Sequence, residues 1–466
     1  MRRTAGYNPN QVAPVRTGSL AALLIMALVA SAADAVRAPY SSVKPVLEAM
    51  RDQLPLELVN PDEAKWDAWS RKEDAAIRAR LEQGDLDSLV NLLLFGTSFT
   101  KQPRIQIQEI VYASKSGVLR ARLDDLMKGL RAPAGNERLV FLRGLVSLKG
   151  MDPDTAEGAQ KIGVFILGNL ERVLKELRTY AQRAEEARRP ADATPEFIER
   201  SRLFRDRGVS LDTSILPNFG IEETLRDLKT RGVLREGGVE RAAVIGPGLD
   251  FIDWDSGYDY YPQQTLQPFA VHDSLLRLGL AKKGMAGITV LDISPRVLDH
   301  LRRARQRAQS GQDYVVQLPR DPARQWLAPV VQYWRSFGDQ IGAPATSLQP
   351  PALLKGLDTR AVRVRPAIVL GSEPVDLNII FGQYPETFDV VVGTNIFVYY
   401  DEFEQALALH NVAAMLKPGG ILLTNTALPE RPEVSMKVLG FTKVQYAAGA
   451  GMGDNFICYQ KQLRAP

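Results

Sequence analysis

The chain has 466 residues, too many for one ordinary hydrophobic core, so we expect two domains with extensions. The net charge of +4 is small for this length and offers no concentrated basic surface, so we expect no nucleic-acid partner. The single cysteine, Cys458, excludes an internal disulfide and a cysteine-rich metal site. The histidines at positions 272, 300 and 410 lie far apart, and we expect no metal site.

The first 35 residues have the pattern of a secretory signal peptide. Three arginines precede an uncharged run rich in Leu and Ala, residues 20–33, and two Ala-x-Ala frames follow at residues 30–32 and 33–35. A basic start, an apolar stretch of about 7–15 residues and a small-residue cleavage site are typical of export signals. We therefore expect an exported protein, periplasmic or extracellular, with no transmembrane segment after the signal. An uncleaved anchor, or a buried helix in a cytoplasmic protein, is the alternative.

Residues 36–236 have the pattern of an all-α helical domain. Apolar residues recur at steps of three and four, most clearly from Ile162 to Ala184, which gives one apolar stripe. The stripe either packs in the core of a bundle or binds a partner. Two polar loops, residues 95–100 and 207–214, either cap helices or line a cleft facing the second half of the chain. Helices are predicted at residues 63–81, 86–94, 105–127, 137–148 and 162–188.

Residues 237–466 have a different sequence pattern. Short runs of Val, Ile and Leu that end in Gly, Asp or Asn alternate with helical segments, which is typical of βαβ units and a parallel sheet. We therefore predict an α/β fold, a Rossmann-like doubly wound sheet that ends in an antiparallel hairpin. Strands are predicted at residues 242–245, 288–291, 367–370, 390–393, 421–425, 443–447 and 456–460.

The first two strands each end in residues that could hold a ligand. Gly246-Pro-Gly248 follows the first strand, and a ligand can approach the backbone there because glycine has no Cβ. An ordinary tight turn is the alternative. Asp292 ends the second strand, where a carboxylate can accept hydrogen bonds from both hydroxyls of a ribose. It could also join the cap of the next helix, which begins at Ser294 and Pro295.

Polar residues also follow the third and fourth strands. Asp376 comes after the third strand, where it could accept a hydrogen bond from an adenine amine or lie on a surface loop. Asn395 ends the fourth strand, which lies beside the first in a doubly wound sheet. We expect the Asn395 side chain to face the bound ligand.

An insertion, residues 249–287, separates the glycine turn from the second strand and is rich in acids and aromatics. Aspartates at positions 253, 255 and 259 begin like a calcium loop, but Gly257 and Gln264 stand where ligands are needed. The tyrosines at positions 258, 260 and 261 either form a lid over an acceptor or belong to a folded loop that seals the junction between the two halves. His272 is either a general base or a packing residue.

Two blocks around the fourth strand carry a resemblance to a known family: residues 388–400, FDVVVGTNIFVYY, and residues 415–423, MLKPGGILL. They resemble class I S-adenosylmethionine (SAM)-dependent methyltransferases, in particular the chemoreceptor-type protein methyltransferases. The likeness covers roughly residues 241–460. It implies SAM as cofactor and places these residues around it: Gly246 and Gly248 at the methionine and ribose, Asp292 at the ribose, Asp376 at the adenine, and Asn395 near the reactive methyl.

The chain departs from that family in several places. Val244 stands where many members have an acidic residue, Asp250 replaces a small residue, and the insertions at 249–287 and 312–362 are long. The resemblance implies a methyltransferase that acts on an unidentified small-molecule or protein acceptor. Methyl transfer depends mainly on alignment of the reactants, so the catalytic residue stays open among Asn395, Tyr261 and His272.

Two alternatives to a methyltransferase remain. SAM is made in the cytoplasm, so an exported protein that keeps this fold could be a non-catalytic binding protein. The acids of the first insertion could instead bind a polyamine, as in an aminopropyl transferase or another enzyme with an adenosyl ligand.

Overall fold

The computed structural model describes residues 34–106, 109, 115–187, 213–252, 257–285, 287–448 and 453–462. Contacts divide the chain into residues 1–33 and residues 34–466. Nearly all of the predicted signal peptide, most of the predicted loop 207–214 and the aspartates at 253 and 255 therefore lie outside the described residues. The boundary predicted between residues 236 and 237 remains a prediction.

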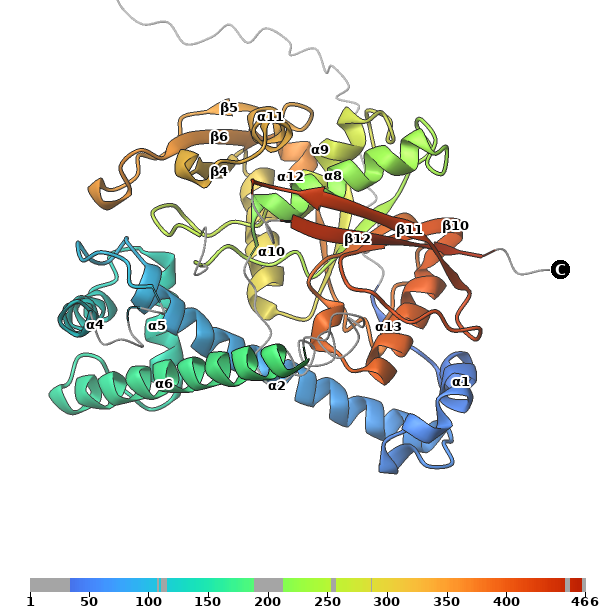
Figure 1. Cartoon of the computed structure of the whole chain (residues 1–466), viewed down its shortest axis with the longest axis horizontal. Helices are drawn as coiled ribbons and strands as arrows, with labels where there is room; N and C mark the ends of the chain where they lie inside the picture. Colours follow the sequence, from blue (N-terminus) through green and yellow to red (C-terminus); the bar gives the residue numbers. More distant parts are fainter. Residues whose placement is uncertain are drawn as a thin grey trace, which may run out of the picture. The chain divides into compact units, whose positions relative to one another are not determined.

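The described helices are labelled in Figure 1 where there is room. They are α1 (Tyr40–Ala49), α2 (Glu63–Phe95), α4 (Ser116–Arg131), α5 (Glu137–Leu148), α6 (Ala156–Ala187), α8 (Ile215–Thr230), α9 (Gln267–Arg277), α10 (Pro295–Gln309), α11 (Ala328–Ser336), α12 (Pro366–Gly371) and α13 (Glu402–Met415). The strands are β1 (Val36–Arg37), β2 (Ala242–Ile245), β3 (Ile288–Asp292), β4 (Tyr314–Arg320), β5 (Gly342–Ala345), β6 (Asp358–Val364), β7 (Glu373–Asp376), β8 (Gly382–Gln383), β9 (Phe388–Gly393), β10 (Leu416–Thr424), β11 (Met436–Gln445) and β12 (Gly453–Lys461).

A seven-stranded sheet of order β11-β12-β10-β9-β2-β3-β7 organises the second half of the chain. The strands β10, β9, β2, β3 and β7 are parallel, whereas β12 is antiparallel to both β10 and β11. The chain runs from β2 outward to β3 and β7 and then returns to β9 on the other side of β2. The direction of winding thus changes between β2 and β9. The predicted α/β class with a parallel-rich central sheet is confirmed.

One predicted strand is wrong. Residues 367–370 belong to the short helix α12, and the third parallel strand is β7, directly after it. Pro366 occupies the first turn of α12, where its missing N–H costs nothing, and only Val369 is buried. A four-residue apolar run cannot by itself distinguish a buried strand from a short helix.

The insertion at residues 312–362 contains structure that the sequence did not predict. It supplies β4 and β5, and with β6 these form a separate antiparallel sheet of order β4-β6-β5. The helix α11 packs against it, and the Trp334 indole N–H donates to the Leu318 carbonyl at 3.0 Å.

The helices α2, α4, α5 and α6 share one apolar core. Ile162, Ile166 and Leu170 of the predicted α6 stripe are buried in it. Of the two uses predicted for the stripe, these residues therefore serve core packing. The helix α2 is continuous over 33 residues, although two helices were predicted in this range. It begins at the N-cap Asp62 and in Figure 1 runs, in blue, from α1 beside α13 to the α4–α6 bundle.

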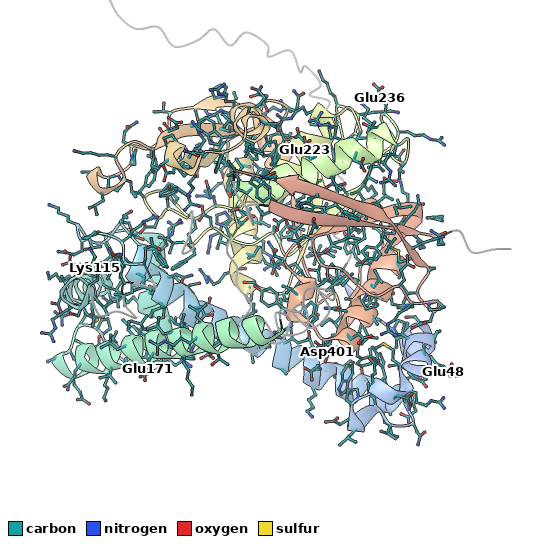
Figure 2. All side chains as sticks on the ribbon, viewed as in Figure 1. Glu48, Lys115, Glu171, Glu223, Glu236 and Asp401 are labelled. Carbon is teal, nitrogen blue, oxygen red and sulfur yellow. The ribbon has the colours of Figure 1, made fainter. Side chains whose placement is uncertain are left out.

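The helix α8 packs on the sheet. Its Phe219 and Leu225 lie in the same apolar core as Val244 of β2 and Val290 of β3. Charged residues such as Glu48, Glu171 and Glu236 are exposed at the surface (Figure 2). Within the part of the chain that is described, no helix combines the length and the apolar character needed to cross a membrane.

Candidate ligand-binding site

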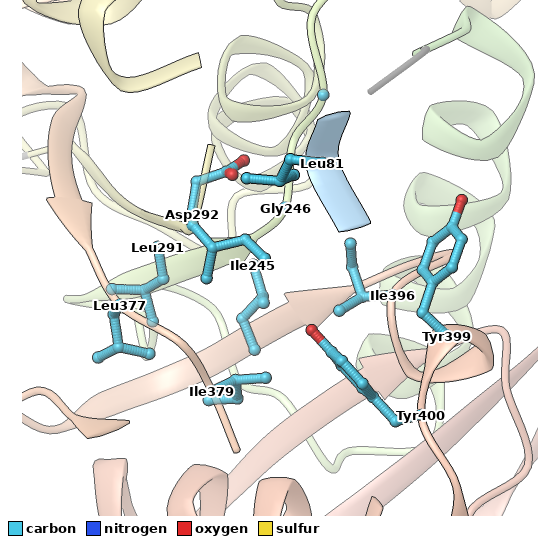
Figure 3. A pocket seen from close by; sticks show the side chains of 12 residues that line it. Leu81, Ile245, Gly246, Leu291, Asp292, Leu377, Ile379, Ile396, Tyr399 and Tyr400 are labelled. Atoms are coloured by element: carbon cyan, nitrogen blue, oxygen red, sulfur yellow. The ribbon is translucent and has the colours of Figure 1, made fainter. Parts of the chain in front are cut away.

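A pocket lies at the carboxyl ends of the central strands (Figure 3). Open α/β sheets bind ligands at this edge, beside the point where the winding direction changes. The lining residues come from the ends of four parallel strands and from α2. At the end of β2 they are Ile245, Gly246 and Gly248, and at the end of β3 they are Leu291, Asp292 and Ile293. Leu377 and Ile379 follow β7, Ile396, Tyr399 and Tyr400 follow β9, and Leu81 belongs to α2.

Both glycines of the turn adopt backbone conformations that favour a residue without a side chain. Gly246 has φ +61° and Gly248 has φ +74°, in the left-handed region that other residues adopt only with strain. A Cβ at position 246 would lie 2.1 Å from the Cδ1 atom of Ile396. The space above Gly246 is thus filled by Ile396, from the loop after β9. The cavity that remains has a volume of about 40 Å³, room for a few water molecules.

Asp292 lies at the pocket and also supports the next helix. Its side chain is only 6 % exposed, and Oδ1 accepts a hydrogen bond from the Ser294 N–H at 2.7 Å. Burial raises the pKa of Asp292 to about 7, against the opposing effect of the backbone N–H groups of Ser294 and Ile293. Figure 3 shows the carboxylate turned toward Gly246 and Leu81. The ligand and capping interpretations are therefore compatible in this geometry.

Asp376 and Asn395 lie next to the pocket without lining it. Asp376 is paired with Asp292 in the β3–β7 register, and its half-exposed carboxylate forms an ion pair with Arg78 of α2 at 2.8 Å. Asn395 has φ +58° and is joined to Asn425 by two hydrogen bonds of 2.7 Å: the Asn395 N–H donates to Oδ1 of Asn425, whose Nδ2 donates back to Oδ1 of Asn395. The residue that follows each in the chain does line the pocket.

Tyr261 and His272 do not line the pocket. The Tyr261 hydroxyl donates to the Asp250 carboxylate at 2.7 Å, and burial, with that carboxylate beside it, raises the pKa of Tyr261. His272 is buried on α9, where burial and Arg365 lower its pKa to about 4. Among the described residues its Nδ1 atom has no hydrogen-bond partner. Both side chains therefore pack inside the protein, and Asn395 is the catalytic candidate that lies nearest to the pocket in the chain.

The described part of the first insertion is fastened to the N-terminal half by contacts that we call the clamp: Asp259 with Thr97 and Ser98, and Arg138 with the insertion backbone. The Asp259 carboxylate accepts hydrogen bonds from the N–H and hydroxyl groups of Thr97 and Ser98, over 2.5–3.0 Å. The Arg138 guanidinium donates to the carbonyls of Asp250, Phe251 and Tyr261.

These contacts favour the folded loop over the lid for residues 257–264. The predicted loop 95–100 faces the second half of the chain through Thr97 and Ser98. Tyr258, Tyr260 and Tyr261 pack edge to face on one another. No group of acidic, Cys or His side chains suited to a metal ion occurs within the described ranges.

The residues that close the pocket were not predicted from the sequence. Leu81 belongs to a helix far away in the chain, and its neighbours on that helix are mostly charged or polar. Tyr399 and Tyr400 were quoted within the fourth-strand block, whose aromatic end was the available signal, but no role was assigned to them. Ile396 lies in the same block.

No protein-family model and no curated protein matches the chain. Solved structures match it at low identity. The N-methyltransferase NodS from Bradyrhizobium japonicum WM9 is 14 % identical, with 53 % of this chain and 97 % of that chain covered and a TM-score of 0.26. The magnesium protoporphyrin IX methyltransferase ChlM from Synechocystis PCC 6803, with bound SAM, is 9 % identical, with 61 % and 90 % covered and a TM-score of 0.25.

The glycopeptide N-methyltransferase MtfA is also similar, at 13 % identity, with 55 % of this chain and 94 % of that chain covered and a TM-score of 0.27. All three matched structures are thus methyltransferases. Because the identities and TM-scores are low, the function of this chain is inferred from its own sheet and pocket.

Proposed function

We propose that the protein binds SAM in this pocket and transfers its methyl group to an acceptor. The observation that supports this most is that Gly246, Gly248 and Asp292 line one pocket beside the change of winding, at the ends of adjacent strands. The narrower likeness to chemoreceptor-type methyltransferases, and with it a protein acceptor, remains a prediction from two sequence blocks.

The residues present fit an adenosyl ligand. The glycine turn lacks side chains where a ligand would approach the backbone, and Asp292 offers a carboxylate to a ribose. Leu377 and Ile379 offer apolar walls to a base. SAM would supply a methyl group on a sulfonium, which the lone pair of the acceptor would take.

Aromatic residues would exclude water from this reaction. Tyr399 and Tyr400 are both 5 % exposed and line the pocket. Burial raises the pKa of Tyr400, so its hydroxyl stays neutral and can donate a hydrogen bond at neutral pH. A dry, aligned site is what methyl transfer needs, since proximity and orientation supply most of the rate.

A non-catalytic protein that keeps this fold is the second candidate. Ile396 fills the space above Gly246, and only a small cavity remains. A site that has lost its ligand would keep its pocket filled in this way. The two candidates differ in whether the pocket ever binds SAM.

Isothermal titration with SAM and with its demethylated product, S-adenosylhomocysteine (SAH), tests the proposal. The Asp292→Ala variant would lose hydrogen bonds to the ribose, worth about 1.5–3 kcal/mol each for bonds to a charged group. Affinity should therefore fall by about one to two orders of magnitude or more. Asp299→Ala, an exposed acid on α10, serves as the control and should bind as the wild type does. If wild-type protein binds neither compound at millimolar concentration, the non-catalytic candidate is preferred.

We also propose that the protein is exported and that its first residues are removed. This rests on the basic, apolar and small-residue pattern of residues 1–35. Sequencing of the mature N-terminus should place it near residues 33–36. An intact Met1 on cytoplasmic protein would contradict the proposal.

A further inference from the structure

The middle of α2 lies against the residues that surround the pocket. Leu81 lines the pocket itself, and Figure 3 shows it reaching in from α2. Arg78 donates to the Asp376 carboxylate at 2.8 Å and to the Ile293 carbonyl at 3.2 Å. Positions 74, 78, 81 and 85 all make such contacts, and this spacing places them on one face of the helix. One helix face thus covers the ends of β3 and β7.

Two further polar contacts complete this cover. The Asn378 side chain, after β7, donates to Asp74 at 2.8 Å. Asp85 forms an ion pair with Arg296 at the start of α10. These contacts beside Leu81 are polar, and each joins α2 to a segment that follows a parallel strand. Ile77, in the same stretch of α2, is buried, and Arg80 donates to the Tyr399 carbonyl at 3.0 Å.

The pocket is narrow while this cover is in place. Leu81 lines it, Ile396 fills the space above Gly246, and the cavity of about 40 Å³ has room for a few water molecules. The Arg78 and Asp376 side chains are 31 % and 52 % exposed. An ion pair exposed to this degree exchanges with water at small cost, so the Arg78–Asp376 pair can open without unfolding the protein. The Asp85–Arg296 pair is less exposed, at 19 % and 17 %.

The helix also contains a point at which it could bend. Gly84 lies inside α2, and glycine in a helix interior costs about 1 kcal/mol relative to alanine. The Ser88 hydroxyl donates to the Gly84 carbonyl at 3.0 Å, a bond that favours helix bending. On either side of the cover, α2 is held by apolar packing: Trp69 contacts Phe381 and Phe403, and Phe95 lies in the bundle core.

We propose that residues 74–85 of α2 form a latch over the pocket, fastened by Arg78 to Asp376 and Ile293, and that a ligand is admitted only when the latch opens. The nature of that ligand rests on the proposed function, whereas the closure of the pocket does not. Arg78 then controls how often the pocket is open.

Thiol reactivity measures this opening without any ligand. The native Cys458 is 2 % exposed and its thiol pKa is raised to about 12 by burial, so the background reaction is slow. A cysteine in the pocket, Leu81→Cys, is compared in the full chain with Lys72→Cys, whose position on α2 is well exposed. We expect the pocket thiol to react with a maleimide several-fold more slowly than the thiol at position 72, because Leu81 is partly buried and opening of the latch would expose it further.

The latch variant is Arg78→Ala in the Leu81→Cys background. It should raise the labelling rate of the pocket thiol about two- to fivefold, because the loss of a partly exposed ion pair has an effect of this size. Arg71→Ala, which removes an exposed ion pair with Asp67 on the same helix, is the matched control and should change nothing. Equal rates for the cysteines at positions 81 and 72, or an Arg78→Ala effect no larger than that of Arg71→Ala, would overturn the latch.

Hydrogen exchange gives a second measurement of latch opening that needs no introduced cysteine. The amides of residues 74–85 should exchange faster in Arg78→Ala than in the wild type and in Arg71→Ala. Unchanged exchange would overturn the latch even if the cysteine variant does not fold. Titration with SAH separates the two proposals: failure of both wild type and Arg78→Ala to bind counts against the proposed function, while the thiol rates still decide the latch.

Discussion

The clamp and the latch both join the N-terminal half to the sheet half, and they differ in burial and in chemistry. In the clamp, Arg138 and Asp259 are 1 % and 3 % exposed and bond mainly to backbone groups. In the latch, Arg78 and Asp376 are 31 % and 52 % exposed and bond to each other through their side chains. The same residue types thus form buried contacts in the clamp and a partly exposed ion pair in the latch.

This difference decides which junction can open. A buried charge whose partners are removed is strongly destabilising, because nothing replaces its hydrogen bonds. A charge near the surface regains water when its partner leaves, so its loss costs little. We therefore expect the clamp to stay fixed throughout the life of the folded protein and the latch to open. A helix held at both ends by apolar packing, with a partly exposed ion pair in its middle, suits a cover for a pocket.

The variant Asp259→Ala should show the largest effect. It leaves the N–H groups of Thr97 and Ser98 without their acceptor. We expect a loss of about 3–5 kcal/mol in the free energy of unfolding, measured with urea, because hydrogen bonds to a charged group are worth about 1.5–3 kcal/mol each. The exposed acid Asp299, paired with Arg302, provides the control, and Asp299→Ala should cost less than about 1 kcal/mol. Similar losses for both variants would remove the distinction between buried and exposed junctions.

Asp292 extends the comparison to a buried acid at the pocket. Its pKa is raised from 3.8 to about 7, so the folded protein keeps this proton to a higher pH than the unfolded chain does. The corresponding stability is present below pH 4 and is lost as the pH rises through 7. Relative to Asp292→Asn, the wild type should lose up to about 4 kcal/mol between pH 4 and pH 8, measured by urea unfolding. A difference that stays constant with pH would show that Asp292 is not desolvated.

The part of the site that could be predicted from sequence is the part encoded locally. Gly246, Gly248 and Asp292 each stand directly after an apolar run, and the topology of a parallel sheet brings such ends together. Local pattern also misleads where it is short. Residues 367–370 were predicted as a strand and form α12, because four apolar residues suit either structure.

The rest of the site depends on contacts between distant positions. Arg78 and Asp376 are 298 positions apart, and nothing in either neighbourhood indicates the other. Leu81 is an apolar residue in a mostly charged and polar part of α2, and nothing in that pattern indicates a pocket. The clamp has the same origin, since Asp259 was considered for calcium and instead binds backbone N–H groups 161–162 positions away. The sequence therefore predicted the strand-end residues of the pocket but not the residues of α2 that cover it.

The smallest expected effect is that of Arg78→Ala on stability, and it tests the comparison directly. Because Arg78 and Asp376 are partly exposed, water replaces the lost bonds, and the free energy of unfolding should fall by less than about 1 kcal/mol. Arg71→Ala should give a similar small change in urea unfolding. A loss as large as that of Asp259→Ala would mean that the middle of α2 is a permanent junction like the clamp. A small loss together with faster thiol labelling at position 81 means that Arg78 holds the pocket shut without holding the protein together.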